Sequence, residues 1–226
     1  MVKREFEFNS RGGFSWGPHL IASTASDELI TTLSEKGKEV RNPKFDWSNA
    51  LAGRIKEEYK FQDYQEWFPP LFHQHLVDYF DSLPEGKSKQ TIKSWKNGFE
   101  WQIESLWINY QGPKEYNPPH THGGDLSFVI YVDIPQEILD ENETYQKETG
   151  KIGPGIIVFD SGDSVYGNFL SFFNNTINFT PKTGMILIFP AYLTHHVYAF
   201  DSDVKRVSVS GNISFHWEES EEGVPL

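Results

Sequence analysis

Residues 184–215 read GMILIFPAYLTHHVYAFDSDVKRVSVSGNISF. The stretch contains three short runs rich in valine, isoleucine and phenylalanine, and turn-forming residues separate them at Pro190 and at Asp201–Asp203. Short apolar runs bounded by such residues are typical of β-strands. The stretch therefore predicts consecutive strands joined by short connections.

The same texture continues upstream of this stretch. Further short runs with turn residues between them are Leu126–Ile134, Gly155–Asp160 and Phe169–Phe173. The pair Asn97-Gly98, between residues 91–96 and 99–110, is a strong hairpin signal because both residues tolerate the backbone of a tight turn. Many short strands with regular turns predict an all-β sandwich or barrel.

Helical patterns precede this β-rich region. We predict helices over Thr24–Arg41, Asn49–Phe61 and Phe72–Leu83, with Pro69-Pro70 marking the start of the third. The polar stretch Pro135–Lys151 is expected to be an exposed loop. The expected organisation is a single domain: N-terminal helical segments over residues 1–94 pack on a β core over 95–217, and an acidic tail covers 218–226. The fold class is mainly β with flanking helices.

Composition excludes several classes of protein. Lys and Arg number 20 against 32 Asp and Glu, a net charge of −12, which argues against a general binder of nucleic acid or anionic membranes. The absence of cysteine excludes disulfides, thiolate zinc sites and cysteine nucleophiles. No apolar run approaches the roughly 18 residues of a membrane span. We therefore expect a cytoplasmic protein whose metal ligands, if any, are His, Asp or Glu.

Histidines form two tight groups within the expected β core, His120-x-His122 and His195-His196. In extended chain, residues i and i+2 project to the same side, about 6–7 Å apart, so two imidazoles can converge on one metal ion. A third ligand from another strand would complete the facial triad of non-haem iron enzymes. The same spacing at His73-x-His75 lies in an expected helix, where the side chains diverge, and we interpret that pair as structural.

Two ordered motifs carry a family resemblance. They are NPPHTHGGDLSFVIYV over residues 117–132 and GMILIFPAYLTHHV over 184–197, the second followed by RVSVSGNI over 206–213. The chain resembles 2-oxoglutarate- and Fe(II)-dependent dioxygenases, above all phage and bacterial members related to prolyl hydroxylases. The resemblance implies a double-stranded β-helix, a jelly-roll barrel of cupin-like form. It also implies Fe(II) and 2-oxoglutarate as cofactors and O₂ as co-reactant. The expected activity is hydroxylation of a peptide or small molecule, with release of succinate and CO₂.

The resemblance assigns roles to individual residues. It implies that His120 and His195 bind iron. It also implies that the distal carboxylate of 2-oxoglutarate is held by Arg206, Ser208, Tyr131 and Ser127. If the last two strands form a hairpin centred on Asp201-Ser202, His195 lies opposite Ser208, and these side chains share one face. The plainer interpretation of Arg206 is a surface ion pair with Asp201 or Asp203.

The third iron ligand is left open by the sequence. The family motif is His-x-Asp or His-x-Glu, whereas this chain has His122 at that position. Either His122 binds the metal, or Asp125 does after a bend at Gly123-Gly124. We prefer His122 because the i+2 spacing needs no bend.

Two other functions remain as alternatives. One is a cupin-like metalloenzyme with three histidine ligands and no 2-oxoglutarate, for which Arg206 would be dispensable. The other is a non-catalytic jelly-roll binding module whose histidines are incidental.

Overall fold

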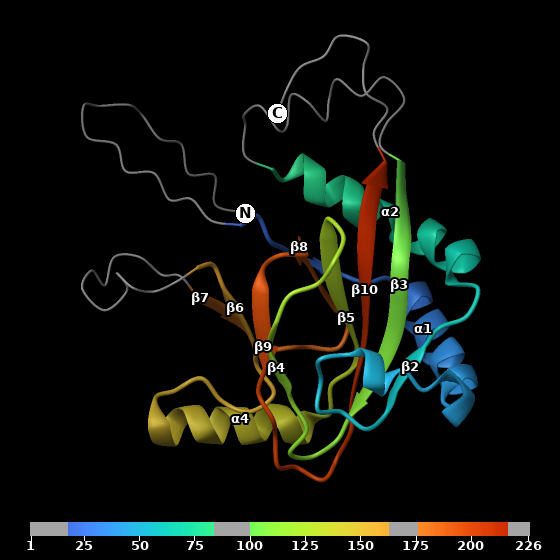
Figure 1. Cartoon of the computed structure of the whole chain (residues 1–226). Coiled ribbons are helices and arrows are strands. Elements are labelled where there is room, and N and C mark those ends of the chain that lie inside the picture. The colour runs from blue at the N-terminus through green and yellow to red at the C-terminus, as the bar shows by residue number, and fades with distance from the viewer. Residues whose placement is uncertain (1–17, 84–99, 163–175, 217–226) are drawn as a thin grey trace, which may run out of the picture.

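The computed structural model describes residues 18–83, 100–162 and 176–216. Its strands form two antiparallel sheets, drawn in Figure 1. The large sheet contains, in spatial order, β1 (Ile21–Thr24), β8 (Met185–Pro190), β5 (Leu126–Asp133), β10 (Arg206–His216), β3 (Glu100–Gln111) and β2 (Glu58–Lys60). The small sheet contains β4 (Asn117–His120), β9 (Thr194–Val197), β6 (Ile157–Asp160) and β7 (Thr176–Phe179). The expected mainly β fold is confirmed.

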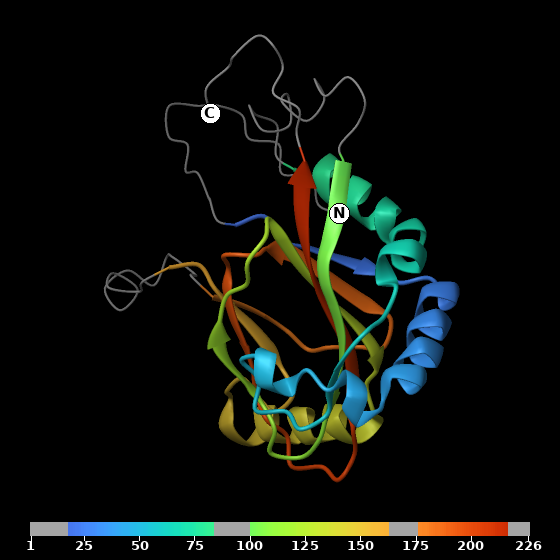
Figure 2. The same cartoon turned by 45° about the vertical axis from the view of Figure 1, so that its right-hand side comes forward.

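Two helices cover the outer face of the large sheet. α1 (Asp27–Val40) and α2 (Tyr64–Asp81) lie on the same side of it, as the turned view in Figure 2 shows. The predicted first helix is confirmed, and it begins where Ser26 accepts a hydrogen bond from the backbone N–H of Leu29. Burial of one face of each helix against the sheet supplies most of its stability.

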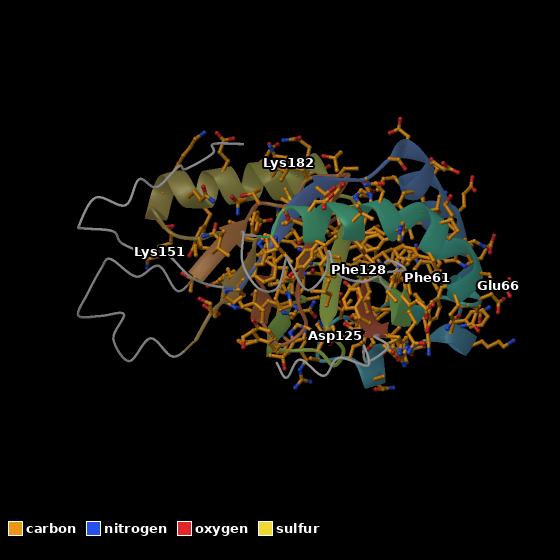
Figure 3. All side chains as sticks on the ribbon, turned by 90° about the horizontal axis from the view of Figure 1, so that it is seen from above. Phe61, Glu66, Asp125, Phe128, Lys151 and Lys182 are labelled. Carbon is orange, nitrogen blue, oxygen red and sulfur yellow. The ribbon has the colours of Figure 1, made fainter. Side chains whose placement is uncertain are left out.

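The main hydrophobic core lies between these helices and the large sheet. Phe68 and Phe72 of α2 are fully buried there, and both stack near Phe128 of β5 with ring centroids 5.4 and 4.4 Å apart. Figure 3, seen from above, places Phe128 inside the dense layer of side chains beneath α2. A smaller core lies between the two sheets, where Val129, Phe159 and Phe189 meet.

The predicted helix over Asn49–Phe61 is wrong. The structure has a short 3₁₀ turn at Ser48–Ala50 and then β2, which pairs with β3. Strand pairing at the edge of the sheet overrides a weak helical pattern, because the edge of β3 offers backbone partners that an isolated short helix would lack.

The predicted role of Pro69-Pro70 as a helix start is also wrong. α2 begins five residues earlier at Tyr64 and contains both prolines. Each proline removes one backbone donor, but Phe68 and Phe72 are fully buried on either side of the pair. That packing offsets the missing hydrogen bonds.

The predicted loop over Pro135–Lys151 is a helix, α4 (Gln136–Thr149), which lies below the sheets in Figure 1. Ile138 and Asn142, four residues apart, form its buried face, and Gly150 ends it in the left-handed region with φ of 68°. The short apolar stripe was hidden by the polar composition of the segment.

Several predictions concern residues outside the described ranges. The hairpin at Asn97-Gly98, the strand at Phe169–Phe173 and the tail over 218–226 all lie there. The division between 1–94 and 95–217 stays a prediction. Among the described helices, none combines the length and the apolar composition that a membrane crossing requires.

Candidate functional site

Three histidines from two segments converge between the sheets. His120 of β4 pairs directly with His195 of β9, and His122 follows two residues after His120. The ring centroids are 4.3 Å apart for His120 and His195, 4.9 Å for His120 and His122, and 5.0 Å for His122 and His195. One ring nitrogen from each lies within 4.8 Å of the other two. The group has the spacing that one metal ion needs.

Backbone carbonyls orient two of these rings. Nδ1 of His120 lies 2.7 Å from the carbonyl oxygen of Pro118, and Nδ1 of His195 lies 3.0 Å from that of Leu193. A carbonyl oxygen only accepts, so Nδ1 carries the hydrogen in both rings. Nε2 therefore keeps its lone pair, which is the state of a metal-binding imidazole.

Burial keeps the three imidazoles neutral. It is the main reason why the pKa of His195 falls to about 3 and that of His122 to about 4, and the neighbouring His120 contributes to both shifts. The pKa of His120 is lowered as well, mainly by burial. Neutral rings can bind a cation at neutral pH without first losing protons.

Asp125 is not part of the histidine group. Its carboxylate accepts a hydrogen bond from the backbone N–H of Phe215 at 2.8 Å, and its side chain lies at the border of the molecule in Figure 3. The bend expected at Gly123-Gly124 is present, since Gly124 has φ of 90°. It turns Asp125 toward β10, where the backbone N–H of Asp125 also donates to Ile213.

Arg206 lies buried on the large sheet, at the start of β10. It is 2 % exposed, its Nη1 donates to the carbonyl oxygen of Gly155 at 3.0 Å, and its guanidinium lies 5.7 Å from the ring centre of Tyr131. Among the described residues, its Nε has no hydrogen-bond partner and no carboxylate forms an ion pair with its guanidinium. The surface ion pair with Asp201 or Asp203 is therefore wrong. A buried, unpaired cation is unstable on its own and favours an anionic ligand.

The hydroxyl of Tyr131 is the second unpartnered group beside this guanidinium. Burial raises the pKa of Tyr131 to about 12, although the charge of Arg206 acts in the opposite direction. The phenol is therefore protonated and can donate a hydrogen bond. Ser208 lies directly opposite Tyr131 in the register of β10 and β5, and it accepts a hydrogen bond from Asn109 at 3.4 Å.

The expected hairpin between the last two strands is wrong. β9 belongs to the small sheet and β10 to the large one, so His195 does not pair with Ser208. The connection between them is held by Glu141 of α4, whose carboxylate accepts hydrogen bonds from the backbone N–H groups of Asp201 and Ser202. The chain thus crosses between sheets, and His195 and Ser208 line the same cavity from different sheets.

Ser127 lies away from this cavity. Its hydroxyl donates to Asn212 of β10 at 2.8 Å, and Asn212 in turn donates to Ser105 of β3. These bonds link three strands of the large sheet. Ser127 is not among the residues that line the cavity.

A cavity between the two sheets joins the histidine group to the buried arginine. It comprises about 550 Å³ of space, including open solvent at its mouth. Apolar walls come from Ile157, Phe189 and Val197. The polar residues that line it are Glu58, Asn109, Asn117, His120, His122, Tyr131, His195, Arg206, Ser208 and Ser210.

The sequence from residue 105 to residue 212 matches the family described as "Putative 2OG-Fe(II) oxygenase". This segment is therefore similar in sequence to 2OG-Fe(II) oxygenases. The match spans just under half of the chain and includes both histidine motifs and Arg206. The resemblance expected from the sequence is confirmed. The cofactors of such an oxygenase are Fe(II) and 2-oxoglutarate.

Solved structures share the fold of this chain. A prolyl-4-hydroxylase from Pseudomonas putida has a TM-score of 0.52 at 11% identity, covering 87% of this chain and 92% of that one. EctD from S. alaskensis, solved with 2-oxoglutarate and 5-hydroxyectoine, has a TM-score of 0.52 at 13% identity, with 87% and 72% covered. AviO1 from Streptomyces viridochromogenes Tue57 has a TM-score of 0.51 at 11% identity, with 92% and 93% covered. The double-stranded β-helix fold is thereby confirmed. No curated protein is significantly similar to this chain in sequence.

Glu58 and Asn109 are cavity residues that sequence reasoning missed. Asn109 could have been found, because Trp107, Asn109 and Gln111 alternate with apolar residues along β3. Glu58 could not, because its segment was assigned to a helix.

Proposed function

We propose that the protein is an Fe(II)- and 2-oxoglutarate-dependent oxygenase that hydroxylates a peptide or a small molecule. In this proposal, His120, His122 and His195 bind Fe(II), and Arg206 with Tyr131 binds the distal carboxylate of 2-oxoglutarate. One observation carries the proposal: a group of neutral histidines and a buried, unpaired arginine line one cavity.

The residues of the histidine group fit ferrous iron. Imidazole nitrogen is a suitable donor for Fe(II), and three such donors leave positions free for other ligands. Since no carboxylate takes part, the iron would keep its full divalent charge. That charge would strengthen binding of a dianion such as 2-oxoglutarate.

The arginine end fits a carboxylate. The guanidinium of Arg206 offers a planar fork, and the phenol of Tyr131 adds a neutral donor beside it. The unpartnered Nε of Arg206 and hydroxyl of Tyr131 would both gain a partner from one carboxylate. Gly155 holds the guanidinium in place through its carbonyl oxygen.

When bound, iron and 2-oxoglutarate supply the oxidation, in which a substrate C–H bond, O₂ and 2-oxoglutarate become C–OH, succinate and CO₂. The protein's own residues bind and orient the reactants. The carbonyl oxygens of Pro118 and Leu193 keep the ligating nitrogens of two histidines aimed inward. Apolar walls at Phe189 and Val197 exclude water from the reacting groups.

Two structural neighbours support the choice of hydroxylation. One is named a prolyl-4-hydroxylase, and the EctD structure holds 5-hydroxyectoine, a hydroxylated small molecule. The substrate of this chain need be neither of theirs, because the identities are only 11% and 13%.

The test is an anaerobic titration of the protein with Fe(II) and 2-oxoglutarate. Chelation of iron by a keto acid gives a weak visible charge-transfer band, and we expect this band in the wild type. Arg206→Leu should need a much higher 2-oxoglutarate concentration to form it. A cupin-like enzyme with three histidine ligands would bind iron but would not give this band. A plain binding module would bind neither iron nor 2-oxoglutarate.

The third ligand is tested by comparing His122→Ala with Asp125→Ala. We expect His122→Ala to lose iron affinity by at least about tenfold, as loss of one ligand should. Asp125→Ala should bind iron like the wild type, because its carboxylate bonds to the backbone of β10. If Asp125→Ala loses iron and His122→Ala does not, Asp125 is the third ligand.

A further inference from the structure

A row of polar side chains crosses the inner face of the large sheet. Tyr131 of β5 lies opposite Ser208 of β10, Ser208 lies opposite Asn109 of β3, and Asn109 lies opposite Glu58 of β2. Neighbouring strands are about 4.8 Å apart, so the row is about 14 Å long. All four residues line the cavity. The Tyr131 end is the proposed 2-oxoglutarate site, which leaves the Glu58 end without an assigned ligand.

Glu58 is a buried carboxyl group whose side chain forms no hydrogen bond or ion pair with the described residues. It is 1 % exposed, and its Oε2 makes no hydrogen bond. No Lys or Arg within the described ranges forms an ion pair with it. Oδ1 of the neighbouring Asn109 is also without a donor. Two oxygen atoms thus lack a partner at the same end of the cavity. Both accept hydrogen bonds once Glu58 is ionised, which favours a cationic ligand that donates them.

The charges around Glu58 favour a cation. Burial, together with the smaller effect of the charges of Glu115 and Asp46, raises the pKa of Glu58 to about 8. The carboxyl is therefore mostly protonated at neutral pH, and the surrounding potential is negative. The histidines of the same cavity are neutral. Arg206 lies at the start of β10, and β3 separates that strand from β2, which contains Glu58.

Glu58 lies at the cavity wall, close to Gly53 and Asn117. A Cβ atom on Gly53 would lie 2.4 Å from Oδ1 of Asn117 and 3.1 Å from Oε1 of Glu58. Gly53 does not have the positive φ that would explain a glycine by backbone conformation. A side chain at this position would collide with Asn117 and Glu58, so the glycine allows both polar side chains to lie at the cavity wall.

We propose that Glu58 recognises the substrate, by binding a basic nitrogen of it, an ammonium or guanidinium group. This inference rests on the proposed function, because the bound molecule is the one whose C–H bond is oxidised at the histidine group. Asn109 accepts a second hydrogen bond from the same nitrogen. The substrate class is therefore basic amines and guanidines, either free amino acids or the side chain of a basic residue in a peptide.

Binding of such a group releases a proton. The neutral Glu58 carboxyl loses its proton to the buffer, and the resulting carboxylate pairs with the ligand's cation. By linkage, affinity for the cation rises by up to about tenfold per pH unit below the pKa of Glu58 and levels off above it. Close to one proton per ligand is released near pH 7, given the pKa of about 8.

The test is isothermal titration calorimetry on the full chain, loaded anaerobically with Fe(II) and 2-oxoglutarate. The probes are L-lysine, L-arginine, the peptide Gly-Lys-Gly with blocked ends, and L-norleucine as the neutral analogue of lysine. Buffers of different ionisation enthalpy report the proton release. We expect at least one basic probe to bind at least tenfold more tightly than norleucine. Binding of only the free amino acids, or only the peptide, identifies the source of the basic group.

Two variants of neighbouring residues decide the role of Glu58. Glu58→Gln keeps the shape of the side chain, and we expect it to lose at least tenfold in affinity for the basic probe together with the proton release. Glu57→Gln is the matched control, because Glu57 pairs with Arg41 and Lys205 on the other side of the strand. It should bind the probe as the wild type does.

The charge-transfer band separates the two proposals. If the band forms in the wild type and in Glu58→Gln, but no basic probe binds more tightly than norleucine, only the inference on Glu58 is overturned. Unchanged probe affinity in Glu58→Gln overturns it too. If the wild type gives no band, the proposed function fails, and the inference that rests on it fails with it.

Discussion

The two faces of the large sheet differ in how completely their side chains are satisfied. On the outer face, Ile108, Ile130 and Val209 are fully buried in the core beneath α1 and α2. On the inner face, Asn109 and Tyr131 are nearly as buried, yet each keeps a polar atom without a partner. Successive side chains of a strand point to opposite faces of the sheet, so neighbouring residues such as Ile108 and Asn109 of β3 lie on different faces. One strand therefore contributes to stability on one side and to ligand binding on the other.

The unsatisfied groups reduce the stability of the unliganded protein. Within the described ranges, buried side-chain atoms without a hydrogen-bond partner belong to Glu58, Asn109, Gln111, Tyr131, His196 and Arg206. All but His196 lie on strands of the large sheet. Each such group costs about 1–3 kcal/mol relative to a satisfied one. We expect ligands to recover part of this free energy, so that 2-oxoglutarate raises the stability of the fold.

The largest expected effect on stability comes from a substitution in the core that covers the outer face. Phe72→Ala should lower the free energy of unfolding by about 3–5 kcal/mol, because it leaves a cavity between α2 and β5. Urea denaturation measures the change. Ile177→Ala, at a residue 52% exposed on β7, is the control and should change stability by less than about 0.5 kcal/mol.

The comparison between the faces also predicts what Phe72→Ala leaves intact. Its folded fraction should still bind iron, because Phe72 does not line the cavity. A loss of iron affinity without a loss of stability would contradict the division of roles between the faces.

On the inner face, we expect a smaller effect, which lowers ligand affinity and leaves stability unchanged or higher. Arg206→Leu should weaken 2-oxoglutarate binding by about 2–4 kcal/mol, the usual range for loss of one partner of a buried charge pair. The unliganded protein should be as stable as the wild type or more so, since an unpaired buried charge is removed. Titration of 2-oxoglutarate and denaturation without ligand measure the two quantities.

The control for this prediction is Arg206→Lys, which keeps the charge but not the planar fork. It should retain only part of the 2-oxoglutarate affinity. Strong destabilisation of unliganded Arg206→Leu would show that the guanidinium holds the fold together, contrary to the proposed division.

The smallest effect concerns the connection that passes between the sheets. Glu141→Gln should lower the free energy of unfolding by about 1 kcal/mol, because a charged acceptor of two backbone N–H groups is replaced by a neutral one. Burial raises the pKa of Glu141, but its hydrogen bonds with Ser202 and Asp201 together lower it below the usual value.

The lowered pKa gives this contribution a definite pH dependence. A carboxyl whose pKa is depressed on folding stabilises the protein above its unfolded pKa, and the contribution is lost as pH falls through the folded pKa. The wild type and Glu141→Gln should therefore converge in stability under acid conditions and differ at neutral pH. Denaturation curves at both pH values check this, and an equal difference at both would contradict it.

Much of the fold follows from local patterns in the sequence. The first helix was predicted from the apolar pattern of its segment, and the strands β5, β8 and β10 were predicted from runs bounded by turn residues. The proximity of His120, His122 and His195 followed from spacing and from a family resemblance. Their role as iron ligands stays a prediction.

What the sequence did not reveal depends on pairing between distant segments. Turn residues at 201–203 do not determine whether the next strand pairs with the previous one or crosses to another sheet. Here the chain passes from the small sheet to the large one, and the carboxylate of Glu141 binds the backbone of the connecting turn. These hydrogen bonds join residues about 60 positions apart in the sequence. Glu58 was missed for the same reason, because only pairing with β3 makes its segment a strand.

The row from Tyr131 to Glu58 makes the site sensitive to changes in chain length. Insertion of a single residue early in β10 would turn Ser208 to the opposite face of the sheet, because successive side chains alternate. The alignment with Asn109 and Tyr131 would be lost in one event, whereas a substitution alters one group. We therefore expect length variation among homologues to be confined to the connections and to be absent from β10.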